Sequence, residues 1–408
     1  MASFLFTGGR VLDPRRGEAL DGVEVLVEGD RIREVSDRPI KSASAARVDL
    51  GGRVLMPGLI DAHVHVVAAM ADLAANAAQF SSLAALRAGR IMEAMLMRGF
   101  TTVRDVGGAD LGLVQAVEMG VVAGPRLVIS GKALSQTGGH CDMRPRADDR
   151  APFEHRVGAM GRLCDGVEAV RRACREEIRA GAQFIKVMAN GGIASPADPI
   201  HALQFSRDEL AAAVEESANA GTYVSAHLYT DAAIRRAVEC GVHSLEHCNL
   251  ITAETARLAA EAGAVAVPTL VTYEALAREG AALGLKPDSV AKIETVRRAG
   301  LESLSTMRGA GLPMAYGSDL LGEMQAHQSG EFTIRGRVLP AAEVIQAATL
   351  VAATLCGLDG QAGVIEPGAY ADLIVVDGDP LRDLGVLEGQ GARIPAIMKG
   401  GHFHKRNL

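Results

Sequence analysis

The stretch that most constrains the fold is residues 59–66, in which His63 and His65 lie among mostly apolar neighbours. Such a run is typical of a strand buried on both faces in a parallel sheet. Strand residues alternate between faces, so both imidazoles leave the same face. Two neutral imidazoles on one face form half of a metal site, although two core histidines would give the same pattern. Pro57-Gly58 just before the run marks a break where one domain could hand over to another.

From this stretch onward, short apolar runs alternate with amphipathic segments. The apolar runs predict eight strands, at residues 60–66, 102–106, 126–130, 184–188, 223–227, 244–247, 265–271 and 314–317. Helical sequence lies between them, at residues 82–98, 166–180, 207–220, 230–240 and 252–262. Ser82, Thr230 and Thr252 are candidate N-caps, because a hydroxyl can accept from the first free backbone N–H groups. Eight strands, most followed by a helix, predict an α/β fold, a (β/α)₈ TIM barrel.

The two ends of the chain have a different pattern, with short β-like runs separated by glycine turns. In residues 1–56 the runs 23–27 and 31–35 flank a hairpin turn at Gly29, and similar runs occur at 371–377 and 396–399. Neither end has enough apolar residues to form a core alone, so we expect them to pair. The predicted domains are a composite β-sandwich from residues 1–56 plus 363–408, and a barrel from residues 57–362.

Composition excludes several classes of protein. At 408 residues the chain is too long for one small core. A net charge of −7 gives no reason to expect a nucleic-acid surface, and no apolar run is long enough to span a membrane. The N-terminus lacks the pattern of a signal peptide. The six cysteines are scattered without C-x-x-C spacing, which favours free thiols in a reduced, cytoplasmic protein.

The active site of such a barrel lies at the C-terminal ends of its strands. Chemistry-bearing residues fall there on five predicted strands: His63 and His65 on the first, Lys186 on the fourth, His227 on the fifth, His247 on the sixth and Asp319 on the eighth. Imidazole and carboxylate groups gathered in this way are typical of a metal site.

Each of these residues also has a structural interpretation. His227 could be a satisfied core histidine, and Asp319 could cap a helix. Lys186 is harder to explain, because a buried ammonium is costly unless it is paired or chemically altered. A purely structural reading requires all of them to fall in register by coincidence, so we favour a metal site.

This set of residues resembles the amidohydrolase superfamily in its two-metal subtype, over nearly the whole chain and including the split β-sandwich. The resemblance implies that His63, His65 and Asp319 hold one divalent ion and that His227 and His247 hold the other. It implies that Lys186 is carboxylated by CO2 and bridges the two ions as an anion. Mononuclear, deaminase-type relatives usually carry a different residue at this point of strand four, so Lys186 argues against them.

The same resemblance implies a mechanism. Two ions lower the pKa of a bridging water so that hydroxide is available near neutral pH, and one ion polarises the scissile carbonyl. Asp319 takes the proton of that water as general base and passes it to the leaving amine. Zinc is the expected metal because the ligands are rich in histidine, with cobalt or manganese as substitutes.

Within the superfamily, the chain is most similar to cytoplasmic Xaa-Pro dipeptidases and Xaa-Arg/Lys carboxypeptidases, and to ochratoxin-hydrolysing amidases. The stretches that carry this are residues 100–105, 135–140, 188–192, 226–230 and 268–270. The resemblance implies that His140 donates to the substrate carbonyl or its oxyanion, and that Tyr229 binds the terminal carboxylate of the substrate. Structurally, His140 could instead be a loop histidine and Tyr229 a packed residue at a helix start.

The sequence thus predicts hydrolysis of an amide or peptide bond next to a C-terminal residue, with proline as the first candidate. The alternatives are Xaa-Arg/Lys carboxypeptidase activity and hydrolysis of a non-peptide N-acyl amino acid such as an ochratoxin-like compound. An inactive scaffold is a third reading, but such relatives typically lack metal ligands and this chain has the full set. The expected partners are a dipeptide or other small-molecule substrate and further copies of the chain, because relatives form homo-oligomers, often octamers.

Overall fold

Parallel strands form a barrel in the computed structural model, which describes residues 2–193, 195, 198–280, 282 and 287–408. Every pairing between these strands is parallel, in the orders β10-β9-β8 and β12-β11-β13-β14-β15-β16. The strands are β8 (Leu59–Val64), β9 (Phe100–Asp105), β10 (Arg126–Ile129), β11 (Ala133–Ser135), β12 (Gly161–Leu163), β13 (Ile185–Met188), β14 (Val224–Thr230), β15 (Ser244–Leu250) and β16 (Val265–Val267).

The barrel closes through a segment that is not a regular strand. Residues 314–317, predicted as the eighth strand, make one isolated parallel bridge, between Met314 and Ala266. On the other side, the Ala62 amide of β8 donates to the Tyr316 carbonyl at 2.7 Å. The segment therefore lies between β16 and β8 and completes the (β/α)₈ barrel that the sequence predicts. Two further departures are the third strand, which continues after a break at Gly131 as β11, and the unpredicted β12.

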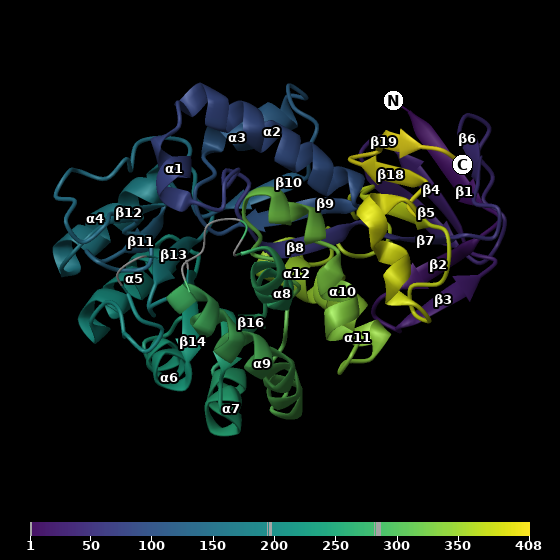
Figure 1. The fold of residues 1–408 in the computed structure, drawn as a ribbon. Helices are drawn as coiled ribbons and strands as arrows, with labels where there is room; N and C mark the ends of the chain where they lie inside the picture. The colour runs from purple at the N-terminus through teal and green to yellow at the C-terminus, as the bar shows by residue number, and fades with distance from the viewer. Residues whose placement is uncertain (1, 194, 196–197, 281, 283–286) are drawn as a thin grey trace.

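Helices surround the barrel strands (Figure 1). They are α1 (Leu73–Ala78), α2 (Ser81–Met97), α3 (Leu111–Glu118), α4 (Val167–Arg179), α5 (Arg207–Asn219), α6 (Asp231–Glu239), α7 (Ala253–Glu261), α8 (Leu270–Glu279), α9 (Pro287–Gly309), α10 (Gly330–Arg335), α11 (Ala341–Gln346) and α12 (Ala352–Leu355), with short helical turns η1 (Gly322–His327), η2 (Ala347–Val351), η3 (Leu384–Leu387) and η4 (Gly389–Gly391). Thr252 caps α7 as expected. Thr230 is at the N-cap of α6 without a side-chain hydrogen bond, and Ser82 lies inside α2 rather than capping it.

Strands from both ends of the chain form two further sheets beside the barrel, with both termini on that side (Figure 1). One sheet has the order β5-β4-β1-β6 and the other β19-β18-β17-β7-β2-β3. Their strands are β1 (Ser3–Thr7), β2 (Arg10–Asp13), β3 (Glu18–Asp21), β4 (Glu24–Glu28), β5 (Arg31–Ser36), β6 (Ala46–Asp49), β7 (Val54–Pro57), β17 (Leu373–Val376), β18 (Ala396–Lys399) and β19 (His402–Arg406). A shared apolar core joins the sheets, with Phe6 and Val25 from one and Leu55 and Val375 from the other. The exact division at residues 1–56, 57–362 and 363–408 stays a prediction.

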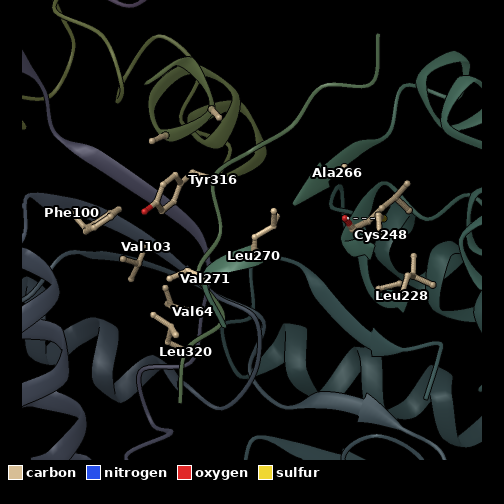
Figure 2. Close-up of a cluster of buried hydrophobic side chains, with 14 of the residues drawn as sticks. Val64, Phe100, Val103, Leu228, Cys248, Ala266, Leu270, Val271, Tyr316 and Leu320 are labelled. Carbon is tan, nitrogen blue, oxygen red and sulfur yellow. Dashed lines mark hydrogen bonds between the residues drawn. The ribbon is translucent and has the colours of Figure 1, made fainter. Parts of the chain in front are cut away.

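The largest apolar cluster lies between the barrel strands and the surrounding helices. Figure 2 shows part of it, with Tyr316 beside Phe100; their ring centroids are 5.6 Å apart. Val64 and Val103 of the neighbouring strands β8 and β9 are also fully buried there. This packing fixes the strands whose ends carry the candidate site. In the part of the chain that the structure describes, no helix combines the length and hydropathy needed to cross a bilayer.

Two adjacent glycines test the contact between the two ends of the chain. Gly400 and Gly401 both have positive φ, +54° and +74°, so alanine at either position costs about 1–2 kcal/mol of backbone strain. A Cβ on Gly401 would lie 1.7 Å from the Gly29 carbonyl oxygen in the β4–β5 turn, whereas a Cβ on Gly400 would meet nothing within 4 Å. We expect Gly401→Ala to lower the free energy of unfolding by about 1–3 kcal/mol more than Gly400→Ala. Thermal unfolding of both variants measures this; equal midpoints would contradict the contact.

Candidate active site

The six predicted metal-binding side chains meet at the C-terminal end of the barrel strands. His63 is on β8 with His65 just beyond it, Lys186 is on β13, His227 on β14, His247 on β15, and Asp319 follows the closing segment. The parallel register places Met188 opposite His227, and Leu228 opposite His247. Neighbouring strands therefore bring Lys186 and the two later histidines to the same edge.

His63, His65 and Asp319 form the tightest group. Nε2 of each histidine lies 3.3 Å from Oδ1 of Asp319, and the candidate ligand atoms of the three residues are all within 4.8 Å of one another. The two imidazoles are buried, while the Asp319 side chain keeps 20% of its surface exposed. This carboxylate is thus the member of the group that solvent or a substrate can reach.

Hydrogen bonds at Nδ1 orient three of the imidazoles. Nδ1 of His63 lies 2.7 Å from Oε2 of Glu246, that of His65 lies 3.0 Å from the Gly107 carbonyl, and that of His247 lies 2.8 Å from Oγ1 of Thr269. A carboxylate and a carbonyl accept only, so the rings of His63 and His65 donate from Nδ1, and Nε2 of each ring faces Asp319. This pattern of outer hydrogen bonds is typical of metal-binding histidines.

His227 completes the group and supplies a test of whether the residues fit a metal. Its ring centroid lies 4.6 Å from that of His247, which lies 4.9 Å from that of His63. Nε2 of His227 is buried without a hydrogen-bond partner among the described residues. Burial and the neighbouring His140 and His247 lower the pKa of His227 well below its usual value, so its ring is neutral. A buried imidazole nitrogen without a partner is costly unless it binds something, which fits a metal ligand.

Lys186 is buried inside this group, with 1% of its surface exposed. Burial lowers the pKa of its ammonium to about 8, although the Glu246 and Asp319 carboxylates act in the opposite direction. A minor fraction of the side chain, but a much larger one than for an exposed lysine, is therefore the neutral amine near neutral pH. A neutral amine is a nucleophile, so this lysine can be modified chemically at its place between the histidines.

Sequence reasoning missed the buried ion pair that supports His63. Arg104 of β9 donates from its NH2 group to Oε1 of Glu246 at 2.6 Å, and Ser225 and Ser244 donate to the same oxygen. Burial alone would raise the pKa of Glu246, but Arg104, Lys186 and His63 hold it well below its usual range. The partner of Arg104 is Glu246 rather than the adjacent Asp105, whose carboxylate accepts from backbone amides. The alternate polar residues Ser244 and Glu246 of β15 were the available signal.

Asp61 is a second supporting residue that the sequence did not single out. Its carboxylate accepts from Oγ of Ser318 at 2.6 Å and from Nε2 of Gln328 at 2.9 Å, which fixes the turn that carries Asp319. Asp319 itself has φ +52°, and His247 has φ +72°. Positive φ at non-glycine residues is strained and persists where the surroundings over-determine it, often at functional sites.

His140 and Tyr229, the predicted substrate-binding residues, also lie beside the histidines. The His140 ring stacks on His227 with centroids 4.1 Å apart, and its Nδ1 lies 2.7 Å from Oγ of Ser195. A Cβ on Gly192 would lie 1.8 Å from this ring, so a larger residue there would displace His140. The Tyr229 ring stacks on His247 with centroids 5.2 Å apart. All eight candidate residues are thus gathered at one end of the barrel, and their roles stay predictions.

Comparison with known proteins assigns the family. A model of the amidohydrolase family matches residues 54–401, which is most of the chain. The chain belongs to the amidohydrolase family. Ochratoxinase from Aspergillus niger is 33% identical over 97% of this chain and 85% of its own length.

Solved structures of this family are similar over their whole length. A prolidase solved in complex with N-methylphosphonate-L-proline is 53% identical, with a TM-score of 0.97, covering 99% of this chain and all of that one. A Xaa-Pro dipeptidase with bound methionine in its active site is 28% identical, with a TM-score of 0.89 and coverage of 99% and 100%. These likenesses agree with the predicted resemblance, and the chain is a hydrolase of this family.

The buried Arg104–Glu246 pair should be far more important to stability than an exposed pair. Arg104→Met leaves the Glu246 charge buried and partly uncompensated, which we expect to cost about 3–5 kcal/mol. Arg297→Met is the matched control: this arginine also pairs with glutamates, Glu274 and Glu294, but 32% of its side chain is exposed, so we expect at most about 1 kcal/mol. Thermal unfolding compares the two variants, and similar losses would contradict the supporting role of Arg104.

Proposed function

We propose that this amidohydrolase cleaves the amide bond before a C-terminal residue, with Xaa-Pro dipeptides as its first substrates. The observation that carries the proposal is the group of His63, His65 and Asp319 beside His227, His247 and Lys186. The prolidase that is 53% identical, solved with a phosphonate analogue of proline, supports the choice of proline.

Two divalent ions, zinc in the first instance, fit the donor set. His63, His65 and Asp319 would hold one ion, and His227 and His247 the other, with Lys186 as a carbamate shared by both. The carbamate accounts for Lys186, because a neutral amine adds CO2 and the resulting anion matches two cations. When bound, the ions supply a water of lowered pKa and polarise the scissile carbonyl.

The remaining steps belong to residues of the chain. The exposed Asp319 carboxylate takes a proton from the attacking water and delivers it to the leaving amine nitrogen. Ser195 donates to Asp198 and therefore accepts from Nδ1 of His140; when this ring is protonated at both nitrogens, Nε2 donates to the oxygen on which negative charge develops. Tyr229, whose pKa is raised by burial and which therefore keeps its proton, donates to the terminal carboxylate of the substrate.

The second candidate is hydrolysis of a non-peptide N-acyl amino acid, which the 33% identity to ochratoxinase favours. Xaa-Arg/Lys carboxypeptidase activity would use the same metals and the same mechanism. The complete set of metal-binding side chains counts against an inactive scaffold. A cytoplasmic location and assembly into a homo-oligomer such as an octamer belong to the same proposal.

Hydrolysis of three substrate classes by zinc-loaded protein prepared with bicarbonate tests the proposal. We expect cleavage of Xaa-Pro, weaker or no cleavage of Xaa-Arg and N-acyl-Phe, and a loss of more than about 100-fold in kcat/KM for Lys186→Ala, because even outer partners of a metal site cost 10–100-fold. Lys399→Ala is the control: Lys399, on β18, also has its pKa lowered to about 8 by burial, and its loss should leave kcat/KM within a few fold.

Three results would count against the proposal in different ways. Cleavage of N-acyl-Phe alone would replace the dipeptidase by the amidase. No cleavage by protein that holds two metal ions would move the substrate outside C-terminal amides. Protein that neither binds zinc nor cleaves any substrate would contradict an active enzyme.

A further inference from the structure

A chain of hydrogen bonds leads from His247 to Tyr229 through two residues that the mechanism has not used. Nδ1 of His247 lies 2.8 Å from Oγ1 of Thr269, which lies 3.4 Å from the Tyr273 hydroxyl. The Tyr273 hydroxyl lies 3.2 Å from the Tyr229 hydroxyl. All four side chains are buried, with at most 3% of any residue exposed. They form one connected row of donors and acceptors at the active end of the barrel.

The Tyr273 hydroxyl donates to Tyr229, but the direction of the hydrogen bonds from His247 to Thr269 and from Thr269 to Tyr273 is ambiguous in the protein alone, because each of these groups can donate or accept. An ion on Nε2 of His247 removes the ambiguity. The proton of this ring must then be on Nδ1, which donates to Thr269. The Thr269 hydroxyl is left to donate to Tyr273, and the Tyr273 hydroxyl to donate to Tyr229.

The Tyr229 hydroxyl is the end of the row, and its own proton has no acceptor among the described residues. The Asp319 carboxylate is not that acceptor, since no hydrogen bond joins the two residues in the described part of the chain. Tyr229 and Tyr273 share an apolar cluster with Ile193, Ile293 and Val296. A buried phenol proton without an acceptor is costly unless a ligand accepts it.

We propose that His247, Thr269 and Tyr273 form a polarity relay, which makes the Tyr229 hydroxyl an obligatory donor toward an anionic group of the substrate when His247 holds its ion. Tyr273 is thus a positioning residue that acts through Tyr229. This inference rests on the proposed function and deepens it, because it states how the metal centre and the carboxylate end of the substrate are coupled. The relay selects substrates that present a carboxylate to Tyr229 and discriminates against substrates that present a carboxamide N–H group or an ammonium at the same point.

Binding of L-proline and L-prolinamide to zinc-loaded protein, measured by calorimetry, tests the relay without turnover. We expect the wild type to prefer L-proline. Tyr273→Phe should weaken L-proline binding about 10-fold, the scale of one hydrogen bond to a charged group, and change L-prolinamide binding less than twofold. The Tyr229→Phe/Tyr273→Phe double variant should bind L-proline as Tyr229→Phe alone does, because Tyr273 acts only through Tyr229.

Tyr316→Phe is the matched control. It also removes a buried phenol hydroxyl, which donates to the Gln328 carbonyl at 2.6 Å outside the relay, so L-proline binding should stay within twofold of wild type. The kinetic counterpart is a split between KM and kcat. For alanyl-proline, Tyr273→Phe should raise KM about 10-fold and leave kcat within about threefold, whereas a general loss of structure would lower kcat as well.

The outcomes separate the relay from the function on which it rests. If the wild type cleaves Xaa-Pro substrates but Tyr273→Phe binds L-proline as Tyr316→Phe does, the relay is wrong and the proposed function stands. Additive losses in the double variant would also overturn the relay, since Tyr273 would then act independently. If zinc-loaded wild type neither cleaves Xaa-Pro substrates nor binds L-proline, the proposed function fails and the relay fails with it.

Discussion

Hydrogen bonds at Nδ1 hold three imidazoles so that Nε2 remains for other contacts, and the active end of the barrel depends on this constraint. The three partners differ in kind: the Glu246 carboxylate for His63, the Gly107 carbonyl for His65 and the Thr269 hydroxyl for His247. The carboxylate is the most demanding of the three, because a buried charge must be compensated. Arg104 and two serine hydroxyls meet that demand from neighbouring strands.

The hydroxyl partner has a different consequence. The Thr269 hydroxyl can accept from His247 and donate to a further group, whereas a carbonyl such as that of Gly107 only accepts and cannot continue the chain of hydrogen bonds. The choice of threonine therefore links the histidine to the two buried tyrosines. One requirement, an imidazole held at Nδ1 with Nε2 left for other contacts, is met in three ways, and of these three partners the threonine hydroxyl is the one that continues the row to the buried tyrosines.

The arrangement of the chain explains how residues distant in sequence reach the same end. His63 comes early in the barrel and Asp319 late, and they meet because the segment around Tyr316 closes the barrel against β8. The amide of Asp319 donates directly to the His63 carbonyl at 2.9 Å, so the contacts that close the barrel also place Asp319 beside His63. The β-sheets from both termini pack on each other through a shared core, and the two ends of the chain therefore lie on one side.

Much of the fold could be predicted because strands and helices of this kind have recognisable local patterns of apolar residues. Buried parallel strands give continuous apolar runs, and the predicted helices at residues 166–180 and 252–262 match α4 and α7 within a residue at each end. The segment 314–317 had the same apolar pattern as a strand, but its hydrogen bonds are shared between two neighbours and only one regular bridge forms. Ser82 failed as an N-cap because α2 begins one residue earlier.

The candidate site, like the fold, could be predicted from the sequence only in part. The polar residues at strand ends could be selected because the active site of such a barrel lies at the C-terminal ends of its strands. The partners of those residues could not, because Arg104 meets Glu246 only through the order of strands around the barrel, and Tyr273 of α8 meets Tyr229 of β14 only in the folded barrel. Adjacency in the sequence is no guide to these partners: Asp105 follows Arg104 directly, yet its carboxylate accepts from the backbone amides of Val66, Gly107 and Ala109.

The most direct test of a two-metal centre is a crystal structure of protein prepared with zinc and bicarbonate, with anomalous data collected at the zinc edge. A two-metal centre predicts two peaks, one among His63, His65 and Asp319 and one beside His227 and His247, with density for a carboxylate on the Lys186 amine between them. A single peak with an unmodified Lys186, or no peak in protein that is fully folded, would contradict it.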